Sequence, residues 1–258
     1  MKRLLFPGFV MTCLLLYPAA ALAIVNVEAV HVGAPTEGFS GTATASAGGA
    51  SGNSNRFRGR ADARLQWHAD KHTDFAVFSY DYGTSRGRTD TNREFAHLRH
   101  RFQFASAWAL EGFVQAERDE FARLSFRGLA GGGLRRTLLE RDAVAAVYLG
   151  LGAMFEREIL RRDFRTSDPR GESIGRANTY LSMQTRFNAQ TQFSSTIFYQ
   201  PAVADATDFR LLEEAALHVR LVDGMELRLN IEVRYDSRPP QTVKTTDITY
   251  TTGITVSF

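Results

Sequence analysis

Apolar and polar residues alternate one by one along most of the chain, and the alternation is clearest in the last segment. Over residues 248–258 a large or apolar side chain occupies every second position, and small polar residues stand between them. A period of two predicts a β-strand with one apolar and one polar face. In a soluble domain such a terminal strand would leave a sticky edge. The pattern is expected in a transmembrane β-barrel, whose apolar face meets lipid and whose closure removes every edge.

Segments of about ten alternating residues, separated by turn signals, recur from residue 38 to the end. In residues 226–236, for example, Leu227 and Leu229 alternate with Arg228 and Asn230. We predict twelve strands, with ten as the alternative if the first or the ninth is misread. The predicted strands are 38–48, 55–68, 73–82, 94–106, 109–117, 121–139, 143–155, 176–187, 192–200, 209–221, 226–236 and 248–258.

The connections between these strands support the barrel, because such barrels alternate short periplasmic turns with longer outer loops. The even-numbered connections are short, at 70–72, 107–108, 140–142, 188–190 and 223–224. Most odd-numbered connections are longer and more polar, at 83–93, 156–175, 201–208 and 237–246, and only the one near 118–120 is brief. We therefore expect an all-β fold, a closed antiparallel transmembrane barrel of about twelve strands over residues 38–258.

The first 23 residues have the pattern of a secretory signal peptide. Lys2 and Arg3 precede a largely apolar stretch over residues 4–20, and residues 21–23 form a small-x-small cleavage site. The stretch is short for a spanning helix, which disfavours the alternative of an uncleaved anchor. We expect cleavage of residues 1–23, a periplasmic segment over 24–37, and location in the bacterial outer membrane.

Composition narrows the chemistry. The only cysteine, Cys13, lies within the predicted signal peptide, so the mature chain would have no disulfide and no zinc–thiolate site. The formal net charge of +3 falls to +1 once Lys2 and Arg3 are removed. That balance is not the polycation expected of a nucleic-acid-binding protein, so no nucleic-acid partner is predicted.

Short motifs, mostly in the C-terminal third, resemble the salt-induced outer-membrane protein family. They are Tyr-Gln-Pro at 199–201, Asp-Phe-Arg-Leu-Leu at 208–212, Arg-Tyr-Asp-Ser at 234–237, Pro-Pro at 239–240 and the terminal Phe258, with similar stretches at 38–41 and 121–133. Tyr250, Ile254, Val256 and Phe258 also resemble the terminal signal by which the barrel-assembly machinery recognises outer-membrane barrels. The family is one of unknown function, so the resemblance implies location and fold and transfers no catalytic residue.

The polar faces of the predicted strands gather more arginines than carboxylates. Rings of arginine favour anions, whereas an interior of ion-paired arginines would stiffen the barrel and conduct nothing. Barrels of about eight strands are filled by side chains and those of about 16–18 hold a water channel, so twelve strands allow both. The lumen-facing candidates are Arg56, Arg58, Arg60, Asp62, Arg64, Arg99, Arg101, Arg123, Arg127, Arg186, Arg228, Glu232 and Arg234.

An enzymatic function would need a serine beside a histidine on the barrel wall, as in lipid hydrolases. The candidates are His97, His100, His218, Ser106 and Ser125. His100 has the lipid-facing parity, but its same-face neighbours Leu98 and Phe102 offer no hydroxyl, so no catalytic residue is assigned. His68 and His72 straddle a turn without a third ligand, so no metal and no cofactor is predicted.

The glycine run over residues 128–133 lacks the lysine and hydroxyl of a phosphate loop. In a barrel strand, glycine instead makes room for a large side chain on the next strand. The arginines of the predicted loop 156–175 could contact lipopolysaccharide phosphates, although a solvated loop is the favoured interpretation.

We predict a narrow passive channel for small solutes, with anions favoured, or a structural envelope protein, and no enzyme. The alternatives are an outer-membrane lipid-modifying enzyme and a secreted soluble β-sandwich or lipocalin-like binder. The expected partners are outer-membrane lipid, lipopolysaccharide and the barrel-assembly machinery.

Overall fold

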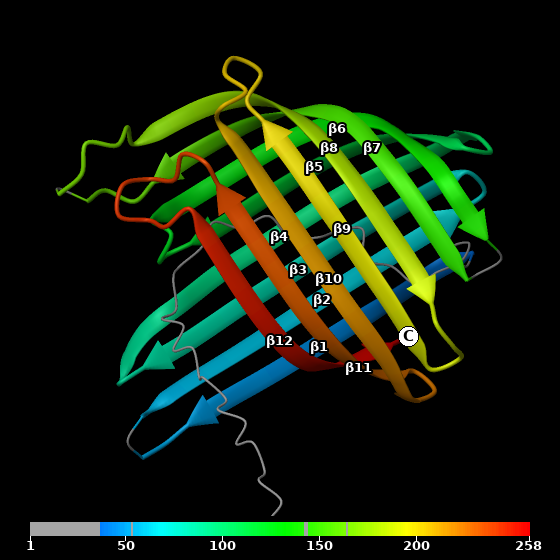
Figure 1. Ribbon diagram of the computed structural model, residues 1–258, viewed down its shortest axis with the longest axis horizontal. Helices are drawn as coiled ribbons and strands as arrows, with labels where there is room; N and C mark the ends of the chain where they lie inside the picture. Colours follow the sequence, from blue (N-terminus) through cyan, green and yellow to red (C-terminus); the bar gives the residue numbers. More distant parts are fainter. Residues whose placement is uncertain (1–36, 53, 142–143, 164) are drawn as a thin grey trace, which may run out of the picture.

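The computed structural model describes residues 37–52, 54–141, 144–163 and 165–258. Within them, twelve antiparallel strands form one closed barrel in which each strand pairs with its neighbours in sequence and β1 pairs with β12 (Figure 1). The strands are β1 (Gly38–Ala50), β2 (Arg56–Ala69), β3 (His72–Ser85), β4 (Arg88–Ala105), β5 (Trp108–Asp119), β6 (Leu124–Arg141), β7 (Ala145–Leu160), β8 (Gly171–Arg186), β9 (Thr191–Pro201), β10 (Phe209–Val222), β11 (Met225–Asp236) and β12 (Thr246–Ser257). The predicted fold and strand number are confirmed, and the ten-stranded alternative is wrong.

Two predicted outer loops are shorter than expected because the strands extend further. The prediction of a loop over 83–93 is wrong: β3 and β4 are joined by Arg86 and Gly87 alone, both with positive φ. Two residues with positive φ form the tight hairpin turn that matches the twist of paired strands. The β7–β8 connection spans 161–170 instead of 156–175. The sequence pattern did not predict these strand ends because their residues are mostly polar on both faces. A strand that projects beyond the membrane needs no apolar face there.

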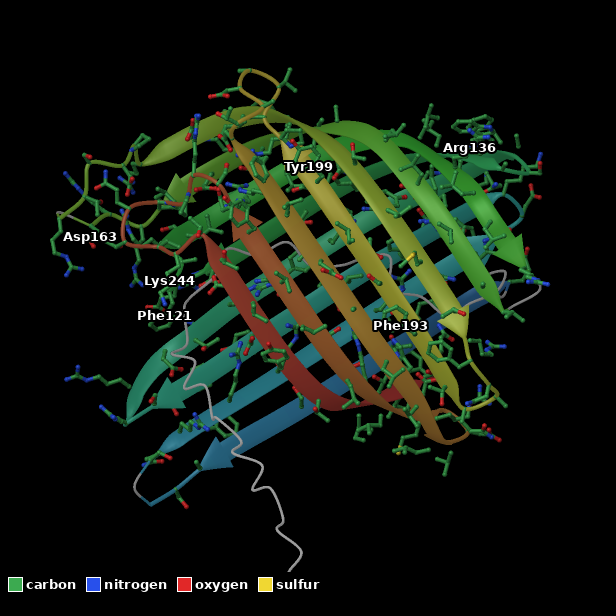
Figure 2. The ribbon with its side chains drawn as sticks, viewed as in Figure 1. Phe121, Arg136, Asp163, Phe193, Tyr199 and Lys244 are labelled. Carbon is green, nitrogen blue, oxygen red and sulfur yellow. The ribbon has the colours of Figure 1, made fainter. Side chains whose placement is uncertain are left out.

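The two ends of the barrel differ as predicted. Short turns join the strands at one end, which we call the turn end, and most of the longer connections lie at the other, which we call the outer end. Figure 2 shows Phe121, Asp163 and Lys244 at the outer end and Arg136 at the turn end. The predicted signal peptide and most of the predicted periplasmic segment lie outside the described residues.

The barrel closes at the turn end. Phe258 and Gly41 exchange two backbone hydrogen bonds of 2.8 and 3.0 Å. Next to them, β1 and β12 pair only from Thr42 opposite Ser257 to Ala45 opposite Ile254, whereas β1 pairs with β2 along its whole length. The two strands diverge toward the outer end (Figure 1).

The faces of the barrel are inverted relative to a soluble protein. Its outer wall exposes a band of large apolar side chains, among them Leu98, Leu110, Val114, Leu134, Leu151, Ile197, Leu229, Ile231 and Ile254. Its interior buries charged and polar side chains on alternate positions of the same strands. This arrangement suits a barrel surrounded by lipid, and it argues against the soluble β-sandwich or lipocalin-like binder, whose core would be apolar. Among the described residues, no helix is long and apolar enough to span a membrane.

Candidate functional site

Strand alternation brings most of the predicted lumen residues to the interior. On β2, β4, β6, β8 and β11 it places there Arg60, Asp62, Arg64, Arg99, Arg101, Arg127, Arg186, Arg228, Glu232 and Arg234. Arg56 and Arg58 lie at the outer end of β2 and are exposed to solvent. Arg58 forms an ion pair of 2.6 Å with Asp81 of the neighbouring β3. The interior therefore carries several arginines between the two ends.

The prediction is wrong for Arg123, which lies in the β5–β6 connection, before β6 begins. Its φ is positive, at 58°, so the backbone turns away from the strand direction at this residue. Its guanidinium bonds to other outer connections instead of lining the lumen, as described below. Periodicity could not show this, because the polar side chain fits the alternation of the strand that follows.

Ion pairs cross the barrel near its outer end in a group that we call the Glu156 cluster: Glu117, Arg127, Glu156, Glu158, Arg176, Arg210 and Asp236. Arg210 on β10 bonds to Glu156 on β7 at 2.7 Å, although two strands separate them in the wall. Arg210 also bonds to its cross-strand neighbour Asp236 at 2.9 Å. Arg127 joins Glu117 at 2.5 Å to Glu158 at 2.6 Å. Arg127 is only 1% exposed, so the interior is filled at this point.

A second group surrounds Glu232 and is called the Glu232 cluster: Arg60, Asp62, Arg93, Glu232 and Arg234. Arg60 from β2 and Arg93 from β4 each place a guanidinium nitrogen 3.9 Å from Glu232 on β11. Arg234 contacts the same carboxylate from its own strand, and Arg60 bonds to Asp62 at 2.9 Å. Side chains from facing walls therefore meet here, with three arginines around two carboxylates.

The third group lies nearer the turn end and is called the Glu111 cluster: Arg99, Arg101, Glu111, Arg135 and Tyr180. Arg101 and the Tyr180 hydroxyl donate to the Glu111 carboxylate at 2.7 and 2.6 Å. Arg99 and Arg135 approach it at 3.5 and 3.7 Å. Among the described side chains of this cluster, three arginines thus surround one carboxylate, so these side chains carry more positive than negative charge. Aromatic rings face some of these charges, as Tyr148 faces Arg135 at 3.7 Å.

Several interior groups can still bond to water or to a solute. Among the described residues, Nη2 of Arg93 and Nε of Arg234 are buried without a hydrogen-bond partner. An unsatisfied buried donor costs about 1–3 kcal/mol, and more when it is charged. Two cavities of about 10 and 20 Å³ lie among the interior side chains, beside Arg234 and beside Arg127, and each has room for about one water molecule.

The β11–β12 connection, residues 237–245, crosses the outer mouth like a strap. Its Val243 packs against Ala122, Leu124 and Leu160, which belong to the side of the barrel opposite β12. The Arg123 guanidinium donates to the carbonyl of Gln241 in this strap at 2.8 Å. The outer opening is therefore covered by contacts between connections that are far apart in sequence.

Glycines make room for large interior side chains. A Cβ atom at Gly150 would collide with the ring of Tyr180, its partner on β8. At Gly131 it would meet the ring of Phe113 on β5 at 2.7 Å. This confirms the structural interpretation of the glycine run that contains Gly131.

The candidate catalytic residues do not assemble as the enzymatic hypothesis requires. His100 bonds to Asp74 at 2.7 Å and approaches His72 at 3.4 Å, and neither partner is a hydroxyl. His97 contacts Gln115 at 3.1 Å in the interior, and His218 lies 3.4 Å from Glu226. Ser106 lies in the β4–β5 turn and Ser125 is exposed on β6. The contact between His100 and Asp74 could not be predicted from the sequence, because it depends on the β3–β4 register.

In the described part of the chain, no group of three or more His, Cys, Asp or Glu residues is arranged to hold a metal ion.

The family comparison covers nearly the whole described barrel. The family model described as "Protein of unknown function, DUF481" matches residues 43–258. The search of curated proteins finds no match.

Among solved structures, the chain is similar to the NanC porin, with 11% identity, a TM-score of 0.48, and coverage of 84% of this chain and 98% of that one. It is similar to the KdgM porin at 11% identity and a TM-score of 0.45, with 85% and 99% covered. The translocator domain of the autotransporter NalP from Neisseria meningitidis matches at 9% identity and a TM-score of 0.44, with 87% and 89% covered. At these values the role of the chain has to be argued from its own residues.

Proposed function

Because the chain belongs to this family of unknown function, we propose a role for it from its own geometry. The role is that of a narrow outer-membrane channel for small solutes, with a preference for anions, closed by its own charged side chains. The observation that carries the proposal is the Glu111 cluster, in which three arginines face the barrel interior around one carboxylate. Rings of arginine attract anions, and low-dielectric walls strengthen that attraction.

Closure in this structure comes from side chains, and side chains can move. Arg127, Arg210 and their carboxylates meet across the interior, where long guanidinium side chains can exchange one oxygen partner for another. A solute that carries acceptor oxygens can replace a carboxylate as the partner of an arginine. Such exchange would open a narrow passage without moving a strand.

A second candidate role is a structural envelope protein with a rigid interior. The near-complete burial of Arg127 and Glu232 favours it, because buried ion pairs hold side chains in one arrangement. The two roles differ in one measurable property: only the channel carries current.

The test is single-channel recording of the refolded protein in planar bilayers, with heat-modifiable migration as the check that the barrel is intact. We expect small, discrete conductance steps and a reversal potential, in a salt gradient, that reports anion preference. Folded protein that conducts no current, both unmodified and after release of the strap by Arg123→Ala, would reject the channel in favour of the structural role. A cation preference would reject the assignment to the Glu111 cluster.

Insertion is proposed to depend on the terminal strand. Tyr250, Ile254 and Val256 are exposed on the outer wall, and Phe258 ends the chain beside Gly41. We propose that the barrel-assembly machinery recognises this strand and that lipid surrounds the apolar band. Lipopolysaccharide is a proposed partner of the outer end, whereas solvation stays the favoured interpretation for the arginines of the β7–β8 connection.

A further inference from the structure

The outer wall carries a polar cluster that the channel does not use. Asp74 on β3 and His100 on β4 are paired across neighbouring strands, and His100 Nδ1 lies 2.7 Å from Asp74 Oδ1. His72 Nδ1 lies 3.4 Å from His100 Nε2. All three side chains have the outward parity of their strands, and those of Asp74 and His100 are each 49% exposed. Three titratable groups on a lipid-facing wall depart from its apolar pattern, and a polar ligand would offset the cost of placing them against hydrocarbon.

An apolar groove of about 510 Å³ adjoins the cluster on the same wall. Asp74 and His100 form part of its lining, and the remainder comes mostly from apolar side chains on β1 to β5, including Phe39, Leu65, Trp67 and Leu98. Such a groove has the chemistry to hold a hydrocarbon chain, and its polar side is formed by the carboxylate and the imidazole.

The cluster lies at the level where lipid headgroups are expected. His72 is the first residue of β3 after the turn at residues 70–71, and Trp67 is the cross-strand partner of Asp74. Phe104 and Trp108 are exposed on the outer wall at the same end of the barrel. Aromatic residues of membrane barrels form belts at the two lipid–water interfaces, so these residues mark one interface.

We propose that the Asp74–His100–His72 cluster and its groove bind one glycerophospholipid with an ethanolamine headgroup, taken from the surrounding membrane. The ammonium of the headgroup would donate to Oδ2 of the Asp74 carboxylate, the phosphate would accept a hydrogen bond from Nε2–H of His72, and one acyl chain would lie in the groove. The choice follows from charge complementarity, because a carboxylate beside two imidazoles matches a zwitterion that carries a primary ammonium and a phosphate.

The hydrogen bonds inside the cluster leave groups for such a ligand. In the described part of the chain, Asp74 uses Oδ1 for His100, and its Oδ2 has no hydrogen-bond partner. His72 uses Nδ1 toward His100, and its Nε2 has none. The His100–Asp74 bond orients the first imidazole, so the cluster is held in place before the lipid arrives.

The test is native mass spectrometry of the detergent-solubilised barrel with three probes: dioleoyl phosphatidylethanolamine, dioleoyl phosphatidylglycerol and dioleoyl phosphatidylcholine. We expect one ethanolamine lipid to stay bound at least about tenfold more tightly than either of the others. Phosphatidylglycerol lacks the ammonium, and the quaternary ammonium of phosphatidylcholine cannot donate a hydrogen bond to Asp74. Equal retention of the three lipids would overturn the proposal.

Two variants locate the site. Asp74→Asn and His100→Ala should each abolish the preference for the ethanolamine lipid and leave barrel migration unchanged. The matched control is Glu94→Gln, which alters another exposed carboxylate on the outer wall, paired with Arg118 at 3.5 Å and outside the groove. A preference that survives in Asp74→Asn, or that is lost in Glu94→Gln, would contradict the assignment. Glycerophosphoethanolamine without acyl chains should not be retained, and its retention would refute the groove.

Discussion

Arg123 in the β5–β6 connection and Asp168 in the β7–β8 connection form an ion pair of 2.5 Å over the outer end of the barrel. The same guanidinium donates to the Gln241 carbonyl and to Thr166, and the backbone N–H of Gln241 donates to Asp168 at 3.1 Å. One arginine thus joins three connections that lie on different sides of the mouth. Its hydrogen bonds therefore hold the strap to the two other connections.

Replacing Arg123 by alanine should release the strap. The change removes charge-assisted hydrogen bonds to Asp168, Gln241 and Thr166, a loss of about 1.5–3 kcal/mol from the closed arrangement, or about a tenfold or greater gain in the open population. Limited proteolysis should then cut residues 237–245 faster, and bilayer recordings should show longer openings. The matched control is Arg165→Ala in the β7–β8 connection, because among the described residues the Arg165 side chain bonds only locally, to Asp163. Equal protection in both variants would contradict this function of Arg123.

Replacing Glu111 by glutamine should strengthen anion preference. The substitution keeps the size of the side chain and removes the one carboxylate among Arg99, Arg101 and Arg135. The positive charge of the three guanidinium groups would then be offset by one carboxylate fewer, so the reversal potential in a salt gradient should move further toward the anion limit. A shift in the opposite direction would show that this cluster does not line the conducting path.

Replacing Gly150 by alanine should destabilise the barrel. The added methyl group would occupy the space of the Tyr180 ring and displace the hydroxyl that donates to Glu111 at 2.6 Å. Overpacking of this kind costs about 1–3 kcal/mol. The midpoint of urea unfolding in lipid vesicles measures it. Gly175→Ala is the matched control, because a Cβ atom there meets nothing within 4 Å. Similar midpoints for the two variants would contradict the steric argument.

Asp205 in the β9–β10 connection should stay ionised down to about pH 2. Hydrogen bonds from Thr207, and then from Arg238 in the strap, lower the pKa of Asp205 from 3.8 to about 2. A folded-state pKa below the unfolded value means that this contact stabilises the loops above about pH 4 and is lost as the pH falls through about 2. NMR titration of the Asp205 carboxyl carbon should show that midpoint.

The variant Thr207→Val should raise the pKa of Asp205, and Arg238→Ala should raise it by less. A midpoint that stays near 2 in Thr207→Val would show that another group sets the acidity.

Much of the barrel architecture can be predicted from the sequence of each strand by itself. The alternation in residues 226–236 predicts which face of β11 meets lipid, because a period of two is a local property of extended backbone. Strand number and the inward parity of Arg228, Glu232 and Arg234 follow from repeating that reasoning along the chain. The same reasoning failed for Arg123, because the side chain of a turn residue does not follow the inward–outward alternation of the neighbouring strand.

The pairings inside the barrel were decided by the tertiary structure. Arg210 and Glu156 are 54 residues apart in sequence and meet because the curved wall turns the inner faces of β7 and β10 toward each other. Asp74 reaches His100 because the β3–β4 register sets them opposite each other. A register shift of one residue would turn the side chains of the shifted strand to the opposite face of the sheet. The alternation along a strand determines which side chains face the barrel interior and which face lipid. The contacts between side chains of different strands depend on strand register and barrel closure, and the sequence of a single segment determines neither.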